Sequence, residues 1–202
     1  DGAFEQRTEL LHLETLETYP HDCLISVVVS PDGWLYVGRG NTGGQPWTMR
    51  ARDGSTLRNF GDGGNVVRLR LDGSKLEEFA TGFWNPFGLA LDQAGNLFCS
   101  DNDPDSRGPN RILHLVRGGD YGYRAQYGKS GLHPFQSWNG ELPGTLPFVC
   151  GVGESPGTLL SCDWAPGFAK GASLLVAIWA EERIDRIVLE SRGISFAGRV
   201  ET

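Results

Sequence analysis

Two short groups of residues in this sequence have side chains that could take part in chemistry. His21 stands next to Asp22, and histidine suits the role of a general base because its ordinary pKa lies near neutrality. Residues 101–104, Asp-Asn-Asp-Pro, are rich in oxygen atoms, the ligands that calcium prefers. Both groups also have an ordinary structural explanation, because a single histidine after Pro20 is more often a loop residue and because Asp and Asn favour turns.

A short β unit that occurs twice must position these groups. Residues 25–29 and 34–37 are apolar runs on either side of a Pro-Asp-Gly turn, and Asp-Gly between such runs is a strong signal for a hairpin. When Gly33 is aligned with Gly95, the same pattern returns over residues 89–99. Repetition of a short β unit is typical of a propeller or a solenoid.

Three blocks of the chain follow this plan, at residues 24–82, 86–127 and 158–202. The 29 glycines and 11 prolines favour many short strands over helices, and blades of about 40–50 residues with hairpin turns are typical of a β-propeller. We therefore predict an all-β fold in which residues 1–202 form a single β-propeller domain, or a fragment of one, with about three to four blades. Because closed propellers have about four to eight blades, we expect the chain to be part of a larger propeller with remaining blades elsewhere.

The segments between these strands are less regular. We expect residues 10–16 to form the outer strand of a preceding blade, or alternatively a short amphipathic helix. Residues 40–64 are a Gly-rich insertion, and residues 128–157 are rich in Pro, Gly and aromatic residues. Insertions of this length are usually functional or mobile loops, so we expect a loop in both places.

Charge and hydropathy exclude several classes of partner. The chain of 202 residues carries a net charge of −7, which disfavours nucleic acids and anionic membranes because both need a basic surface. No apolar run approaches the roughly 20 residues that cross a bilayer, so we expect no membrane span.

The four cysteines, an even number, do not have the spacing of a zinc site. Cys99 lies in an apolar run and is expected to be a buried core thiol. One disulfide could form in an oxidising compartment, and the sequence leaves open which pair would form it.

Four longer motifs, in order, resemble the soluble quinoprotein glucose/sorbosone dehydrogenase family, in particular its planctomycete-type dehydrogenase-like branch. They are Ser-Pro-Asp-Gly-Trp-Leu-Tyr-Val at 30–37, Asn-Val-Val-Arg-Leu at 65–69, Ala-Thr-Gly-Phe-Trp-Asn-Pro-Phe-Gly-Leu-Ala at 80–90 and Val-Arg-Gly-Gly-Asp-Tyr-Gly-Tyr at 116–123. The resemblance implies a six-bladed propeller that binds pyrroloquinoline quinone (PQQ) and Ca²⁺ in its central mouth. It also implies a periplasmic or extracytoplasmic location and a sugar or polyol substrate, whose hydroxyl carbon gives a hydride to the quinone.

The resemblance assigns roles to two pairs of residues. His21 and Asp22 correspond to the catalytic Asp-His step of the family, in reversed order, and His21 would be the base. Asn85 is retained at the quinone contact, and Trp84 replaces an arginine. Tryptophan could stack on a planar cofactor but cannot pair with carboxylates as a guanidinium does. The alternative is that Trp84 is an apolar plug and that Asn85 is a turn residue before Pro86.

The metal and the remaining quinone ligands follow from the same resemblance. The backbone carbonyls that hold calcium in the family fall on Asp103 and Pro104, whose alternative role is an acidic turn between strands. The quinone-binding lysine of the family falls on Ala180, so this ligand is absent from the sequence.

Three functions are compatible with these residues. The first is a sugar or polyol dehydrogenase that depends on PQQ and calcium. The second is a non-catalytic propeller that serves as a binding or scaffold module of a larger extracytoplasmic protein, with an electron-acceptor domain or further blades as partners. The third is a gluconolactonase-type calcium hydrolase, for which only Asp101 and Asn102 are well placed. Fold alone cannot choose among them.

Overall fold

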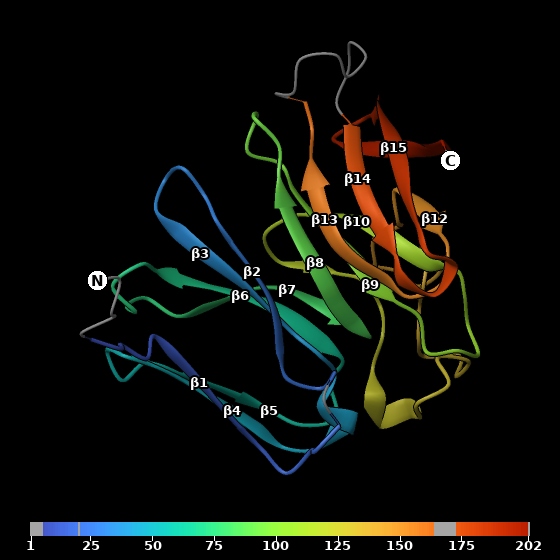
Figure 1. The fold of residues 1–202 in the computed structure, drawn as a ribbon. Coiled ribbons are helices and arrows are strands. Elements are labelled where there is room, and N and C mark those ends of the chain that lie inside the picture. The colour runs from blue at the N-terminus through green and yellow to red at the C-terminus, as the bar shows by residue number, and fades with distance from the viewer. Residues whose placement is uncertain (1–5, 20, 164–172, 202) are drawn as a thin grey trace.

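The computed structural model describes residues 6–19, 21–163 and 173–201 (Figure 1). These residues form sixteen strands in four sheets, together with three short 3₁₀ helices, and within these ranges there is no α-helix. The prediction of an all-β fold is confirmed. None of the helices in the described ranges is long and apolar enough to cross a bilayer.

The first blade contains β2 (Leu24–Val29), β3 (Trp34–Arg39), β6 (Gly64–Arg70) and β7 (Glu77–Phe83), each antiparallel to the next. A short fifth strand, β11 (Gly119–Asp120), adds to β7 in parallel. The Asp-Gly signal is explained by a tight turn between β2 and β3.

The second blade contains β8 (Asn85–Leu91), β9 (Leu97–Asn102), β10 (Asn110–Leu115) and β12 (Cys150–Val152). The sequence predicted a second block that ends near residue 127. In the structure the chain first leaves this blade to pair β11 with the first one, and it returns after a long excursion to supply β12.

The third blade contains β13 (Pro156–Ser161), β14 (Ser173–Ile178), β15 (Arg183–Arg192) and β16 (Ser195–Glu201), again in antiparallel order. A buried apolar cluster joins the first blade to the second, and another joins the second to the third. Each interface between blades is therefore closed by side chains of both sheets.

A smaller sheet of β1 (Leu11–Thr15), β4 (Trp47–Ala51) and β5 (Thr56–Asn59) packs against the first blade. The prediction of a loop over residues 40–64 was wrong, because this segment forms the β4–β5 hairpin. Trp47 and Met49 alternate with polar residues and bury their side chains, which gives the hairpin an apolar face. The segment that includes residues 10–16 does form a strand, and its partner is this hairpin.

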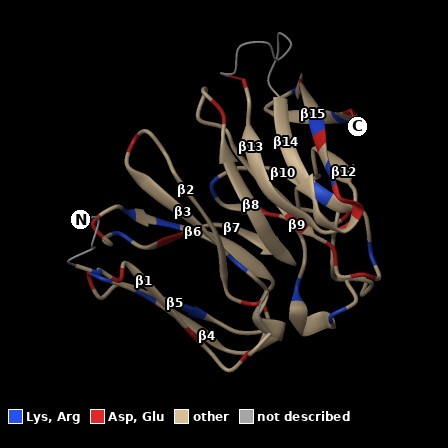
Figure 2. Ribbon diagram, viewed as in Figure 1, with Lys and Arg blue, Asp and Glu red and all other residues tan. Residues whose placement is uncertain are grey.

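The first strands of the three blades, β2, β8 and β13, lie side by side, since β8 contacts both of the others (Figure 1). They form the inner wall of the arc of blades, and all three begin at the same end of the molecule. None of the three contains a charged residue, and charged side chains lie mainly in the other strands and in the loops (Figure 2). We call the end where these strands begin the mouth.

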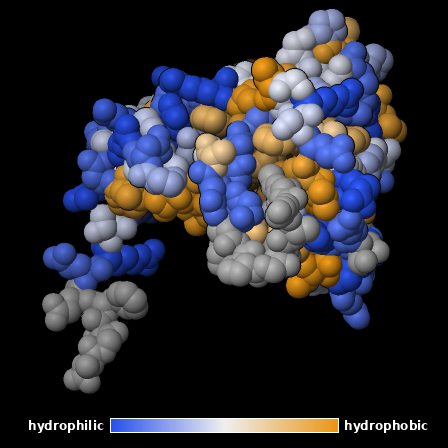
Figure 3. Space-filling model, turned by 90° about the horizontal axis from the view of Figure 1, so that it is seen from above, coloured by the Kyte–Doolittle hydropathy of each residue, from blue (hydrophilic) through white to orange (hydrophobic). Residues whose placement is uncertain are grey.

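Apolar side chains reach the surface on both flanks of this inner wall. Val27 and Val29 on β2 and Leu160 on β13 are at least half exposed, and hydrophobic atoms are visible in separate patches on the face shown in Figure 3. The predicted core thiol, Cys99, is completely buried, and Cys150 and Cys162 are also buried free thiols.

Two arginines are buried completely and have a common arrangement. Arg39 lies over the Trp47 ring at 4.1 Å and pairs with Asp62 at 2.9 Å. Arg111 lies over the Trp138 ring at 3.5 Å and pairs with Asp101 at 2.8 Å. In each case the guanidinium makes five hydrogen bonds, which matches its five N–H donors.

Candidate functional site

A pocket of about 410 Å³ opens at the mouth, between the beginnings of β8 and β13. Its size lies within the range of about 300–1,000 Å³ that is usual for small-molecule sites. The lining includes three rings and several small polar groups. Among the lining residues are His21, Phe87, Asn102, Ser155, Thr158 and Trp179.

Each inner strand is irregular where it approaches the mouth. The antiparallel register shifts between Leu24 and Ser26 in β2, between Pro86 and Gly88 in β8, and between Pro156 and Leu159 in β13. Such bulges bend a strand and redirect its side chains, and they are over-represented beside active sites. Their recurrence at one end of all three blades makes the mouth the candidate functional end.

The inner strands approach one another very closely at these bulges. A Cβ atom on Gly88 would lie 2.6 Å from the carbonyl oxygen of Gly157 and 2.7 Å from the backbone nitrogen of Leu159. Serine hydroxyls tie the blades together at the same level, because Ser26 donates to the Pro86 carbonyl at 2.9 Å and Ser100 donates to the Gly157 carbonyl at 2.7 Å. The walls of the pocket are therefore held rigidly.

The structure places the predicted base, His21, on the lining of the pocket. Its ring is exposed and packs edge-to-face against Tyr19 and Phe87, with ring centroids 5.0 and 5.5 Å apart. Among the described contacts no hydrogen bond joins His21 to Asp22. The Asp22 carboxylate instead accepts Nδ2 of Asn41 at 3.3 Å, so the catalytic role of this pair stays a prediction.

Asp22 is buried, with 7% of its surface exposed. Burial raises the pKa of this carboxyl from 3.8 to about 6, and the negative charge of Glu17 acts in the same direction. The side chain can thus gain a proton just below neutral pH. Asp22 is not on the lining of this pocket but on that of another one, together with Glu17 and Tyr19.

Neither of the two predicted cofactor-binding residues lies on the lining. Asn85 is buried, and the amide orientation that satisfies both of its ends directs Nδ2 to the carbonyls of His21 at 3.1 Å and of Trp84 at 2.9 Å. Trp84 is half-buried and packs edge-to-face on Tyr123 at 5.0 Å. Asn85 therefore fastens the His21 loop to β8, and its quinone contact stays a prediction.

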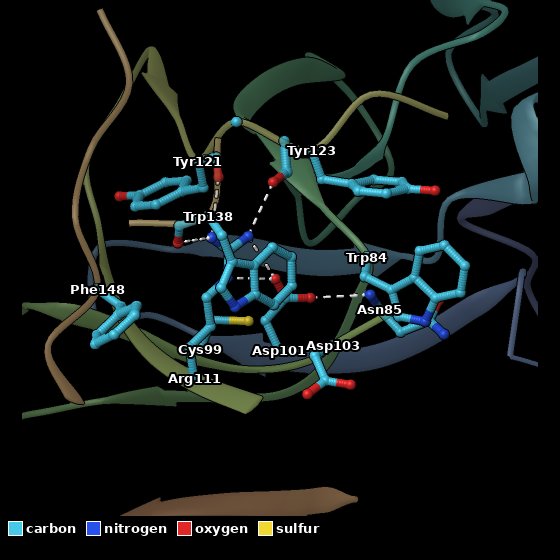
Figure 4. A network of polar contacts seen from close by, with 12 residues as sticks. Trp84, Asn85, Cys99, Asp101, Asp103, Arg111, Tyr121, Tyr123, Trp138 and Phe148 are labelled. Carbon is cyan, nitrogen blue, oxygen red and sulfur yellow. Dashed lines mark hydrogen bonds and ion pairs between the residues drawn. The ribbon is translucent and has the colours of Figure 1, made fainter. Parts of the chain in front are cut away.

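A buried ion pair supports this part of the mouth (Figure 4). Asp101 Oδ2 accepts two N–H groups of Arg111, at 2.8 and 2.9 Å, while Asp101 Oδ1 accepts the backbone N–H of Asn85 at 2.9 Å. Burial raises the pKa of Asp101 to about 6, and Arg111 opposes this shift. The carboxylate is ionised at neutral pH and joins β9, β10 and the beginning of β8.

The predicted calcium ligands lie in a turn that uses several of their polar atoms. Asp103 Oδ1 accepts the N–H of Asp105 at 2.9 Å, and the Pro104 carbonyl accepts the N–H of Ser106 at 2.6 Å. Burial raises the pKa of Asp103, with contributions from Glu154 and Asp105. Calcium needs six to eight oxygen ligands, and in the described part of the chain no group of three or more His, Cys, Asp or Glu side chains could hold a metal. The Pro104 carbonyl is already used within the turn, and calcium binding by the two carbonyls stays a prediction.

One polar atom on the pocket lacks a partner among the described residues. Asn102 lines the pocket, and its Oδ1 atom is buried without a hydrogen bond. A buried acceptor left unpaired costs free energy, so a ligand hydroxyl that reached it would be favoured. Sequence reasoning considered Asn102 only as part of an oxygen-rich turn and of a hydrolase site, and it did not identify Trp179 at all.

The lining does not fit PQQ, which carries three carboxylates. No lysine or arginine lies on it in the described ranges, and carboxylates are normally recognised by such cations. The position expected for a quinone-binding lysine is Ala180, next to Trp179.

No protein-family model matches this chain, and no curated protein matches it in sequence. Solved structures match it in fold. An oxidoreductase (glucose dehydrogenase) from Thermus thermophilus aligns with a TM-score of 0.53 at 16% identity, over 95% of this chain and 87% of that chain. The PQQ-bound form of aldose sugar dehydrogenase from Streptomyces coelicolor aligns with a TM-score of 0.52 at 17% identity, over 88% of this chain and 66% of that chain.

A third structure, a glucose dehydrogenase, aligns with a TM-score of 0.56 at 18% identity, over 89% of this chain and 72% of that chain. At such identities the likeness shows the fold. The prediction of a β-propeller is therefore confirmed, and these three solved structures that share the fold are described as glucose or aldose sugar dehydrogenases.

Proposed function

We propose that the mouth of this propeller binds a neutral sugar or polyol. The observation that carries the proposal is the lining of the pocket, which combines aromatic rings with hydrogen-bonding groups. Among the described residues the lining has no Asp, Glu, Lys or Arg side chain. Sugars present apolar C–H faces beside hydroxyl groups, and such a surface matches them. The likeness in fold to sugar dehydrogenases supports the same class of ligand.

Two residues would contribute most to binding. Trp179 is 79% exposed at the rim of the pocket, and the ring offers a large apolar face that a sugar can cover. Asn102 also lines the pocket, and a rotation of its side chain would let Oδ1, which is buried and lacks a hydrogen bond, accept a ligand hydroxyl. Thr158 supplies a further hydroxyl on the lining.

Isothermal titration with a panel of neutral sugars and polyols tests the proposal. We expect saturable binding of at least one member, weakened about tenfold or more in Trp179→Ala, because the stacking surface is lost. Phe135→Ala is the matched control, since Phe135 is also an exposed aromatic residue, at 64%, and does not line the pocket. Binding that is equally weakened in both variants, or absent for the whole panel, refutes the proposal.

Oxidation of the bound sugar by a PQQ- and calcium-dependent reaction is a second candidate function. The observation that favours it is the fold shared with a PQQ-bound aldose sugar dehydrogenase. The base that we propose for it is His21, which lines the pocket. The lack of cations on the described lining and the occupied turn at Asp103 weigh against it. Dye-linked oxidation of the bound sugar after addition of PQQ and Ca²⁺, lost in His21→Ala, would support this candidate.

We also propose that residues 1–202 belong to one propeller domain or to a fragment of one, because shared apolar clusters join each described sheet to the next. An extracytoplasmic location is proposed from the sequence resemblance alone. Detection of the protein in a periplasmic or culture-supernatant fraction tests it.

A further inference from the structure

We infer that the mouth discriminates by charge: it admits uncharged ligands and excludes those that carry carboxylates, PQQ included. The inference rests on the proposed function, because it concerns the same pocket. It goes further in naming the class of molecule that the propeller rejects and the physical reason for the rejection.

The inner wall of the propeller carries no charge. The strands β2, β8 and β13 contain no charged residue, and no lysine or arginine of the described ranges lies on the lining of the pocket. A carboxylate that entered would lose water without gaining a cation, and such a transfer is strongly unfavourable unless the charge is paired.

Three arginines near the mouth already form ion pairs within the protein. Arg183 contacts both Glu181 and Asp185. Arg111 and Arg39 are fully buried, and the five N–H donors of each are used within the protein. None of these three guanidiniums can turn toward a ligand without breaking an ion pair.

The charge beside the rim of the pocket is negative. Glu181 accepts the N–H of Glu154 at 2.8 Å, and Glu154 in turn accepts Nδ2 of Asn110 at 3.1 Å. Glu154 thus stands directly beside Ser155 on the rim without a cationic partner among the described contacts, whereas the charge of Glu181 is paired with Arg183. Asp22 and Asp103 directly follow the lining residues His21 and Asn102 in the chain, so an anionic ligand would meet further negative charge nearby.

The lysines that the structure describes do not add positive charge to the lining of the pocket. Lys75 and Lys129 both lie off the lining of the pocket. Lys129 acts on Asp22 together with Glu17, and a Cβ on Gly43 would lie 3.5 Å from its Nζ atom. Its charge is therefore directed at the carboxylates of the outer loops.

The experiment compares PQQ, with and without Ca²⁺, with the neutral sugar that binds best in the panel. Quenching of tryptophan fluorescence and isothermal titration give binding without any need for turnover. We expect the wild-type protein to show no saturable PQQ binding that the sugar displaces, up to about 1 mM. The variant Thr158→Arg places a guanidinium on the lining, and we expect it to gain displaceable PQQ binding by about tenfold or more.

Thr56→Arg is the matched control, because it adds the same charge on the exposed strand β5, outside the pocket. Circular dichroism and melting temperature establish that each variant is folded. Displaceable binding of PQQ to the wild-type protein would overturn the inference, and so would a failure of Thr158→Arg to gain more than Thr56→Arg. Failure of every neutral sugar to bind would instead overturn the proposed function, so the two failures are distinguishable.

Discussion

Replacing Asp101 by asparagine should destabilise the propeller by about 3–5 kcal/mol, because removal of one partner from a buried ion pair leaves the other charge uncompensated. Both side chains of the Asp101–Arg111 pair are completely buried, and two N–H groups of the guanidinium reach the same carboxylate oxygen. Water cannot replace the lost partner without opening the second blade.

The geometry leaves an asparagine at this position without a good orientation. One carboxylate oxygen of Asp101 faces Arg111 and the other accepts the N–H of Asn85, so both face donors. The single oxygen of an asparagine can satisfy one side only, and its NH₂ group must then face a donor. If the asparagine oxygen faces Arg111, the backbone N–H of Asn85 loses its acceptor. This smaller loss costs about 1–3 kcal/mol by itself and loosens the beginning of β8 at the mouth.

Urea unfolding followed by tryptophan fluorescence measures this effect. With a slope of about 2 kcal/mol per molar urea, the midpoint should fall by about 1.5–2.5 M. Asp105→Asn is the matched control: it removes the same charge from an exposed turn residue whose φ of 58° asparagine tolerates, and its effect should stay within about 0.5 kcal/mol. Equal midpoints for the two variants would refute the reasoning.

Three further predictions concern other parts of the structure. Because burial raises the pKa of Asp22 to about 6, the native state holds this proton more tightly than the unfolded state, and the contribution of Asp22 to stability should fall as pH rises from about 4 to 6. Asp22→Asn should reduce this fall by about 2–3 kcal/mol, measured as the difference between wild-type and variant urea curves over that pH range. Gly88→Ala should cost about 1–3 kcal/mol because its Cβ meets the backbone of β13, whereas Gly157→Ala, whose nearest contact would be 3.7 Å away, should change the melting temperature little. Arg39→Lys should cost about 2–4 kcal/mol in thermal unfolding, because three donors cannot serve the five contacts of the guanidinium; a loss below about 1 kcal/mol would show that those contacts are dispensable.

Local signals were sufficient to predict most strands. Apolar runs separated by Asp32-Gly33 or by the turn at Gly95 encode hairpins within a few residues of sequence, and both glycines have positive φ, 82° and 87°. The partner of a strand across a long excursion is not encoded in this way. The fourth strand of the second blade, Cys150–Val152, is only three residues long, and its position depends on how the whole segment between 116 and 150 packs.

The site was harder to predict than the fold because side-chain direction depends on the bulges. His21 was identified as a candidate and does line the pocket. Asn85 was identified for its type and neighbours, yet its amide is used between two backbone carbonyls. The sequence pattern could not show this, because the carbonyl of His21 approaches Asn85 only after two blades have packed. Trp179 follows an ordinary apolar strand, and no local motif distinguishes it from a core residue.

The two buried arginines have a consequence for the redox tolerance of the protein. Each guanidinium hydrogen-bonds to segments that are far apart in sequence. It thereby links them as a disulfide does in many secreted domains. Cys99, Cys150 and Cys162 are free thiols inside the sheets, so thiol reductants find no covalent bond between these strands to attack. The melting temperature should therefore be the same in the presence and absence of dithiothreitol, whichever compartment the protein occupies.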